Sequence, residues 1–161
     1  RFQYFYISKT KIVENACIFY IDDDQDDIGI FCDCATRLGH RTVATSAADA
    51  LFKSLKYPPP KADIVLVDLN MPSVDGIEII ERIRANPEWN SLPVIVHSTA
   101  NDNHSIVRCR TAGATMYVRK PDTYSGLSRI INYLVNTDWA TFQPQSHNFY
   151  FSAEQRRELN I

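Results

Sequence analysis

The stretch Ala16-Cys17-Ile18-Phe19-Tyr20-Ile21 is an apolar run of strand length, and it ends abruptly in Asp22-Asp23-Asp24. Such a run is typical of a strand that is buried on both faces of a sheet. Similar short runs recur at 62–67, 94–96 and 116–118, with a weaker one at 42–44. The sequence therefore predicts five buried strands.

Helical patterns separate these predicted strands. Apolar residues recur at helical spacing within 28–38, 47–55, 77–83, 106–112 and 127–134. Each crossover between parallel strands must lay its helix against the sheet, so the alternation predicts an α/β fold. We expect a doubly wound, five-stranded parallel sheet with helices on both faces, formed by residues 16–137.

The two ends of the chain fall outside this pattern. Residues 1–15 are an N-terminal extension, and residues 138–161 are a C-terminal aromatic tail that includes Trp139, Phe142 and Phe149-Tyr150-Phe151. Ser152, with Gln155 three residues later, predicts a short helix at the end of the tail. We expect the aromatic residues to cover the domain's own surface, although a partner-binding role stays open.

The composition excludes several classes of protein. The 161 residues carry a formal net charge of −2, which argues against direct binding to nucleic acid or to an anionic membrane surface. No apolar run reaches the roughly 20 residues that a membrane span needs. The cysteines form no C-x-x-C pair, and free thiols are typical of a reducing compartment. We therefore expect a cytoplasmic protein.

Polar residues stand where the predicted strands end. Asp22 and Asp23 follow the first strand, Asp68 follows the third, Ser98 ends the fourth, and Lys120 follows the fifth. The carboxyl ends of parallel strands meet at one edge, where ligands bind in such sheets. Three adjacent carboxylates repel one another unless a cation neutralises them, and hard oxygen ligands suit Mg²⁺. The pattern predicts a magnesium site.

The same residues could carry phosphoryl transfer. Asp68 would be a carboxylate nucleophile, and Lys120 would hold the oxygens of an arriving phosphoryl group. The product would be an aspartyl phosphate. Ser98 could then donate a hydrogen bond to a phosphoryl oxygen, which would give a switch with two positions.

These motifs together resemble the response-regulator receiver domain of bacterial two-component signalling, which has a flavodoxin-like fold. The matching segments span about 120 residues and occur in the order Ile18-Phe19-Tyr20-Ile21-Asp22-Asp23-Asp24, Val67-Asp68-Leu69-Asn70-Met71-Pro72-Ser73-Val74-Asp75-Gly76, Pro93-Val94-Ile95-Val96-His97-Ser98-Thr99 and Tyr117-Val118-Arg119-Lys120-Pro121. Each segment is weak alone, but all of them in order, each at a predicted strand end, are highly specific.

The resemblance implies a role for each matched position. Asp68 is the expected phosphoacceptor and Lys120 the phosphate contact, with Ser98 and Tyr117 as a coupled switch pair. The expected metal ligands are the side chains of Asp22, Asp23 and Asp68 and the backbone carbonyl of Asn70. A cis peptide bond is expected between Lys120 and Pro121. Thr99 departs from the family, where this position usually holds a smaller residue.

The function implied is that of a stand-alone receiver, which is a signalling switch and not an enzyme beyond its own phosphorylation. A histidine kinase or phosphotransfer protein would phosphorylate it, and a downstream effector protein would respond; a homodimer stays open. One alternative is a small magnesium-dependent hydrolase of the haloacid-dehalogenase type, with Asp22 as nucleophile and Asp24 as acid/base. The other is a pseudo-receiver that binds partners without phosphorylation.

Overall fold

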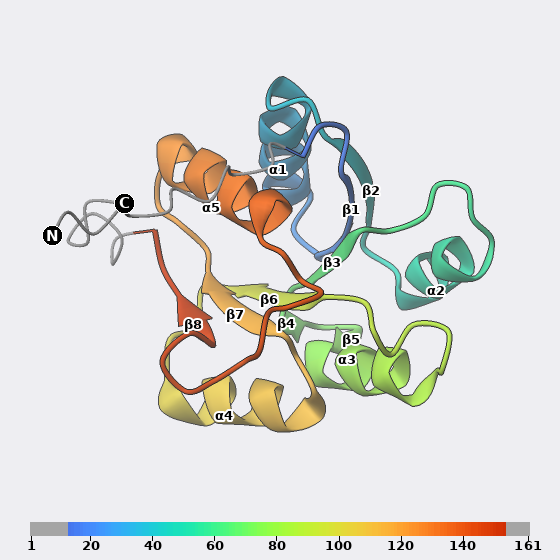
Figure 1. Cartoon of the computed structure of the whole chain (residues 1–161), viewed down its shortest axis with the longest axis vertical. Helices are drawn as coiled ribbons and strands as arrows, with labels where there is room; N and C mark the ends of the chain where they lie inside the picture. Colours follow the sequence, from blue (N-terminus) through green and yellow to red (C-terminus); the bar gives the residue numbers. More distant parts are fainter. Residues whose placement is uncertain (1–12, 154–161) are drawn as a thin grey trace, which may run out of the picture.

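The computed structural model describes residues 13–153, which form an α/β domain around a six-stranded parallel sheet (Figure 1). The order of the strands in the sheet is β2-β1-β3-β6-β7-β8, and all neighbouring pairs are parallel. The strands are β1 (Cys17–Ile21), β2 (Arg41–Thr45), β3 (Ile64–Val67), β6 (Val94–Ser98), β7 (Met116–Arg119) and β8 (Tyr150–Phe151). A small antiparallel pair, β4 (Asn70–Met71) and β5 (Val74–Asp75), follows β3.

Helices cover both faces of the sheet, as predicted (Figure 1). On one face lie α1 (Gln25–Arg37) and α5 (Tyr124–Asn136); on the other lie α2 (Ala48–Lys56), α3 (Gly76–Ala85) and α4 (Asn103–Ala112). Side chains alternate along β1, so that Ile18 and Tyr20 join the core under α1 and α5 while Phe19 and Ile21 join the other core. The predicted doubly wound fold is therefore confirmed.

The start of α3 brings that helix close to the end of β3. Asp75 caps α3 by accepting a hydrogen bond from the backbone nitrogen of Ile77 at 2.9 Å. The next residue, Gly76, packs on the backbone of Asp68, where an added Cβ would collide with the carbonyl oxygen of Asp68. Only glycine permits this approach, which fixes the backbone of Asp68 against α3.

The sixth strand differs from the five-stranded prediction. The segment after α5 crosses back and adds β8 beside β7, where the backbone nitrogen of Tyr117 donates to the carbonyl of Phe149 at 2.7 Å. Phe149 is buried, and the ring of Phe151 stacks on Tyr133 of α5 at 4.6 Å between centroids. The described part of the aromatic tail thus packs on the domain itself.

Two further expectations have different outcomes. The prediction of a cis Lys120–Pro121 bond was wrong. Among residues 13–153 the cis peptide bonds are Pro58–Pro59 and Pro59–Pro60, so the Lys120–Pro121 bond is trans. Trans is the isomer that an X–Pro bond intrinsically favours. The short helix predicted behind Ser152 and most of the N-terminal extension lie outside the described residues. Within the described range, no helix combines the length and apolar character that a membrane crossing needs.

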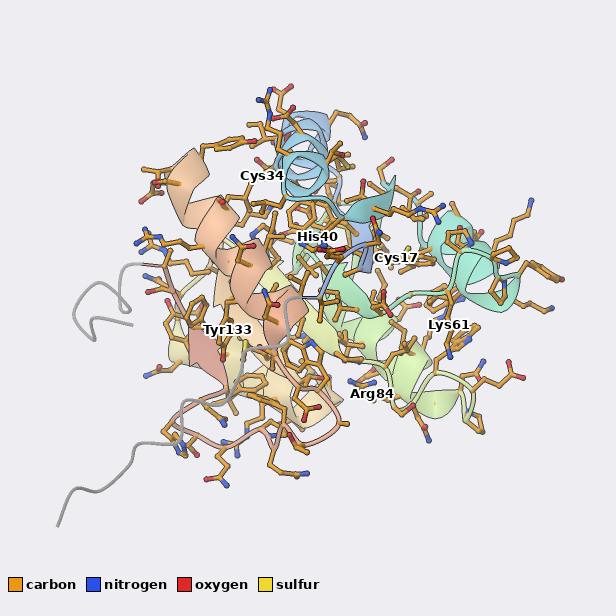
Figure 2. All side chains as sticks on the ribbon, turned by 45° about the horizontal axis from the view of Figure 1, so that its top comes forward. Cys17, Cys34, His40, Lys61, Arg84 and Tyr133 are labelled. Atoms are coloured by element: carbon orange, nitrogen blue, oxygen red, sulfur yellow. The ribbon has the colours of Figure 1, made fainter. Side chains whose placement is uncertain are left out.

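Arg84 of α3, labelled in Figure 2, binds the segments that lead into β6 and β7. These segments lie at the end of the sheet opposite the predicted site. The guanidinium of Arg84 donates to the carbonyls of Gly113, Leu92 and Asn90 at 2.7, 2.8 and 3.1 Å, and to the hydroxyl of Thr115 at 3.1 Å. Burial holds the pKa of Arg84 below its usual value. One side chain thereby links α3 to the segment before β6 and to the turn before β7.

Candidate functional site

The parallel register brings the predicted site residues to one edge of the sheet. Asp22 and Asp23 follow β1, Asp68 follows β3, and the backbone nitrogen of Asp68 donates to the carbonyl of Ile21 at 2.9 Å. On the other side, the backbone nitrogen of Lys120 donates to the carbonyl of Ser98 at 2.8 Å. These strand ends are aligned by the sheet's own hydrogen bonds.

Three carboxylates gather at this edge. Asp22, Asp23 and Asp68 each offer an oxygen within 4.8 Å of the other two. Asp22 is fully buried, Asp68 is almost fully buried, and Asp23 is exposed. Oxygen donors so arranged, with one side open to solvent, fit the coordination that Mg²⁺ prefers.

Asp68 sits where its negative charge is disfavoured. Burial raises the pKa of Asp68 above its ordinary value; the positive charge of Lys120 opposes this shift, and the negative charge of Asp22 adds to it. The backbone nitrogen of Asn70 donates to Asp68 at 3.2 Å, so Asn70 lies beside the carboxylate. A cation bound at the cluster would relieve the charge on Asp68.

Lys120 is the cation that the chain itself supplies. Its ammonium lies 2.7 Å from Asp22, 2.8 Å from Asp27 and 3.4 Å from Asp68. Burial disfavours the charged lysine, but the hydrogen bonds to Asp22 and Asp27 and the charge of Asp68 outweigh burial and raise its pKa above the ordinary value. Lys120 therefore stays protonated, with Asp22 and Asp27 as close partners and Asp68 as a more distant one.

A buried polar chain stands behind Asp22. The hydroxyl of Tyr20 donates to Asp22, and Nδ1 of His97 lies 3.3 Å from that hydroxyl. Burial, followed by the charge of Asp22, raises the pKa of Tyr20, so the hydroxyl keeps its proton. Burial also lowers the pKa of His97 to about 3, so the imidazole is neutral. Because the hydroxyl of Tyr20 donates its proton to Asp22, the Nδ1–H tautomer of His97 is the one that can donate to the oxygen of Tyr20.

Ser98 and Tyr117 converge on one backbone unit. The hydroxyl of Ser98 accepts from the backbone nitrogen of Ala100 at 3.3 Å, and the hydroxyl of Tyr117 donates to the carbonyl of Ala100 at 2.9 Å. Both side chains are buried, and the neighbouring Thr99 is exposed. Ala100 thus connects the predicted switch residues. The ring of Tyr117 also lies near the ring of Tyr150 of β8, with 6.0 Å between the ring centroids.

The contact of Asp27 with Lys120 is a feature that the sequence analysis missed. At the start of a helix behind the acidic strand end, Asp24, Asp26 and Asp27 are expected as caps and first-turn acids. Asp24 is indeed the N-cap of α1 and accepts from the backbone nitrogens of Asp26 and Asp27. Asp27 lies in the first turn of the helix that begins directly behind the acidic strand end, and that position could have placed its side chain near the same sheet edge.

The contacts of Asp22 and Asp24 also bear on the hydrolase alternative. That alternative needs Asp24 as a free acid/base beside a nucleophilic Asp22. Asp24 instead points its carboxylate at the first turn of α1, and Asp22 is bound by Tyr20, Lys120 and the backbone nitrogen of Asp24. The arrangement does not favour a haloacid-dehalogenase-type site.

Comparison with known proteins gives a consistent answer. A family model described as the response regulator receiver domain matches residues 18–132. The chain is 26% identical to the chemotaxis protein CheY homolog of Campylobacter jejuni over 106 residues, which cover 66% of this chain and 82% of that protein.

Solved structures agree on the fold. The phosphorylated cyanobacterial phytochrome response regulator RcpA is 23% identical with a TM-score of 0.67, over 81% of this chain and 97% of that one. The Mn²⁺-bound response regulator Rcp1 is 19% identical with a TM-score of 0.65, over 81% of this chain and 99% of that one. With the family match spanning β1 to α5, the chain belongs to the response regulator receiver domain family of two-component signalling.

Proposed function

We propose that this receiver domain is a switch controlled by phosphorylation of Asp68. The observation that carries the proposal is the meeting of Asp68 with two further carboxylates and the ammonium of Lys120 at one sheet edge. An oxygen nucleophile, a cation site and a fixed positive charge are the groups that phosphoryl transfer needs.

The reaction is an in-line displacement at phosphorus. One carboxylate oxygen of Asp68 forms a bond to the phosphorus while the bond to the leaving group breaks, and the leaving group departs with the electron pair. With a phosphohistidine donor, the nitrogen of the imidazole takes that pair. The donor would be a histidine kinase or a phosphotransfer protein, as in the family.

The metal site would be formed by Asp22, Asp23, Asp68 and the backbone carbonyl of Asn70. Bound Mg²⁺ would neutralise the negative charge that accumulates when a phosphoryl group approaches three carboxylates. The Mn²⁺-bound form of Rcp1 supports a divalent cation in a protein of this fold. Lys120, 3.4 Å from Asp68, would turn its ammonium to a phosphoryl oxygen.

The phosphorylated state would be read through Ser98, Tyr117 and Ala100. If Ser98 turned toward a phosphoryl oxygen, it would give up its bond to Ala100, the residue that also holds Tyr117. The change would reach the surface of α4 and α5, where a downstream effector protein would bind. The phosphorylated structure of RcpA supports this use of the fold.

Intact-mass measurement tests the proposal directly. Incubation with Mg²⁺ and acetyl phosphate should add one phosphoryl group to the wild-type protein and none to Asp68→Ala. Asp49→Ala, which removes an exposed acid of α2, is the matched control and should be phosphorylated like the wild type. An adduct on Asp68→Ala would refute the assignment of Asp68 as the phosphoacceptor. No adduct on the wild type would refute the proposal and favour a pseudo-receiver.

A further inference from the structure

The position of Lys120 suggests that another residue controls its availability. Its ammonium makes short contacts of 2.7 and 2.8 Å with Asp22 and Asp27, but stands 3.4 Å from Asp68. Lys120 thus lies nearer to α1 than to the residue whose phosphoryl group it would bind. Moving closer to that group would lengthen the contact with at least one of its two closer partners.

Asp22 and Asp27 differ in what they lose when Lys120 leaves. Asp22 keeps two other donors, the hydroxyl of Tyr20 and the backbone nitrogen of Asp24. Among residues 13–153, Asp27 has no other ion pair or side-chain hydrogen bond than the one to Lys120. The pair with Asp27 is therefore the contact that a departing Lys120 gives up completely.

Asp27 is also not needed for the other features of the site. It lies outside the cluster of Asp22, Asp23 and Asp68, and the cap of α1 is Asp24. Its side chain is 40% exposed, so water can solvate the carboxylate when the lysine is absent. Asp27 and Lys120 border a cavity of about 260 Å³, which has room for that water.

We infer that Asp27 competes with the phosphoryl group for Lys120 and thereby slows the phosphorylation of Asp68. The inference rests on the proposed function and adds a positioning residue to it. The pair between Asp27 and Lys120 stabilises the resting protein but is lost when the ammonium moves to the phosphoryl oxygens. An interaction present only in the ground state raises the barrier to reaction.

The decisive comparison is between Asp27→Asn and Asp26→Asn. Both acids lie in the first turn of α1, so each substitution removes the same charge at the same end of the helix, but only Asp27 contacts Lys120. With acetyl phosphate and Mg²⁺, Asp27→Asn should gain its phosphoryl group about fivefold faster than the wild type, the size expected for a partly exposed ion pair. Asp26→Asn should stay within about twofold.

A thermodynamic cycle tests the pair without phosphorylation. The stabilities of Asp27→Asn, Lys120→Met and the double variant should be non-additive, because each single change removes the same contact. The phosphorylation rate of Lys120→Met should not respond to Asp27→Asn, since the lysine through which Asp27 acts is gone.

The possible outcomes distinguish the proposed function from the inference about Asp27. Failure of every variant to take up phosphate would refute the proposed function, and the inference with it. Phosphorylation of the wild type, with Asp27→Asn no faster than Asp26→Asn, would overturn only the inference. An additive cycle would do the same, because it would mean that Asp27 and Lys120 do not interact.

Discussion

Lys120 and Arg84 are two partly buried cations at opposite ends of one sheet, and they are bound in opposite ways. Arg84 donates to three backbone carbonyls and one hydroxyl, which are neutral and fixed by the fold. Lys120 contacts three carboxylates at 2.7, 2.8 and 3.4 Å, and these arise from three different segments. Arg84 is bound by neutral acceptors, most of them on the backbone, whereas Lys120 is bound by charged side chains at unequal distances.

This difference separates a structural charge from one that can take part in a reaction. The planar guanidinium of Arg84 matches its acceptors as a set, so any movement breaks several bonds together. The ammonium of Lys120 is a point charge on a flexible stem, and it can exchange one oxygen for another at low cost. Three experiments test this difference between Arg84 and Lys120 and the environment of the site.

The largest effect is expected for Lys120→Met. Removing the ammonium leaves Asp22 and Asp68 as buried carboxylates without their cation, which should cost about 4 kcal/mol of unfolding free energy when divalent ions are chelated. Mg²⁺ should restore part of the loss and stabilise this variant more than the wild type. Urea unfolding with and without Mg²⁺ measures both quantities. Equal magnesium stabilisation of the two proteins would contradict the idea that metal and lysine neutralise the same carboxylates.

Arg84→Met should cost slightly less, about 3 kcal/mol, because four acceptors lose their donor in a partly buried region. Its stability should not depend on Mg²⁺, and its phosphorylation rate should be unchanged where the protein is folded. Arg37→Met, which removes an exposed pair with Asp33, is the control and should cost far less than Arg84→Met. If Arg84→Met and Arg37→Met were equally stable, Arg84 would not be a structural clamp.

The smallest effect concerns pH and the neutral His97 behind the site. The pKa of His97 in the folded protein is about 3, below its ordinary value of 6.5, so the unfolded chain binds more protons as the pH falls below 6.5. The stability that the neutral His97 contributes is therefore complete above pH 6.5 and is lost progressively as the pH falls toward 3. Between pH 7.5 and 5.5 the loss from His97 should be about 1.4 kcal/mol.

Thermal unfolding of the wild type and His97→Leu at these two pH values measures that contribution. The variant should lose less stability on acidification and keep the part that arises from His40, whose pKa burial also lowers. The same pH dependence in both proteins would show that His97 is not the group that resists protonation.

The fold and the edge of the site could be predicted because both depend on local patterns. A continuous apolar run that stops at a polar residue marks where a buried strand ends, and this pattern located Asp22, Asp68, Ser98 and Lys120 without any knowledge of contacts. The helical spacing of apolar residues within 77–83 likewise predicted α3.

What the sequence did not indicate depends on contacts between distant segments. Tyr150 and Phe151 are too few to form a recognisable strand alone, and they pair only because β7 presents a free edge. Asp27 and Lys120 are 93 positions apart, so their contact follows from the packing of α1 over the sheet. The hydroxyl of Tyr20 could not be assigned for the same reason, since within the run 16–21 it looks like any core aromatic.

The short strand β8 has a consequence for how another molecule could approach Tyr117. It occupies the hydrogen-bonding edge of β7, which a partner could otherwise extend with a strand of its own. A covalent connection of 13 residues, 137–149, joins β8 to α5 and keeps it at a high effective concentration beside that edge. A competing strand would have to overcome this intramolecular advantage, so partners that bind over β8 without displacing it are favoured.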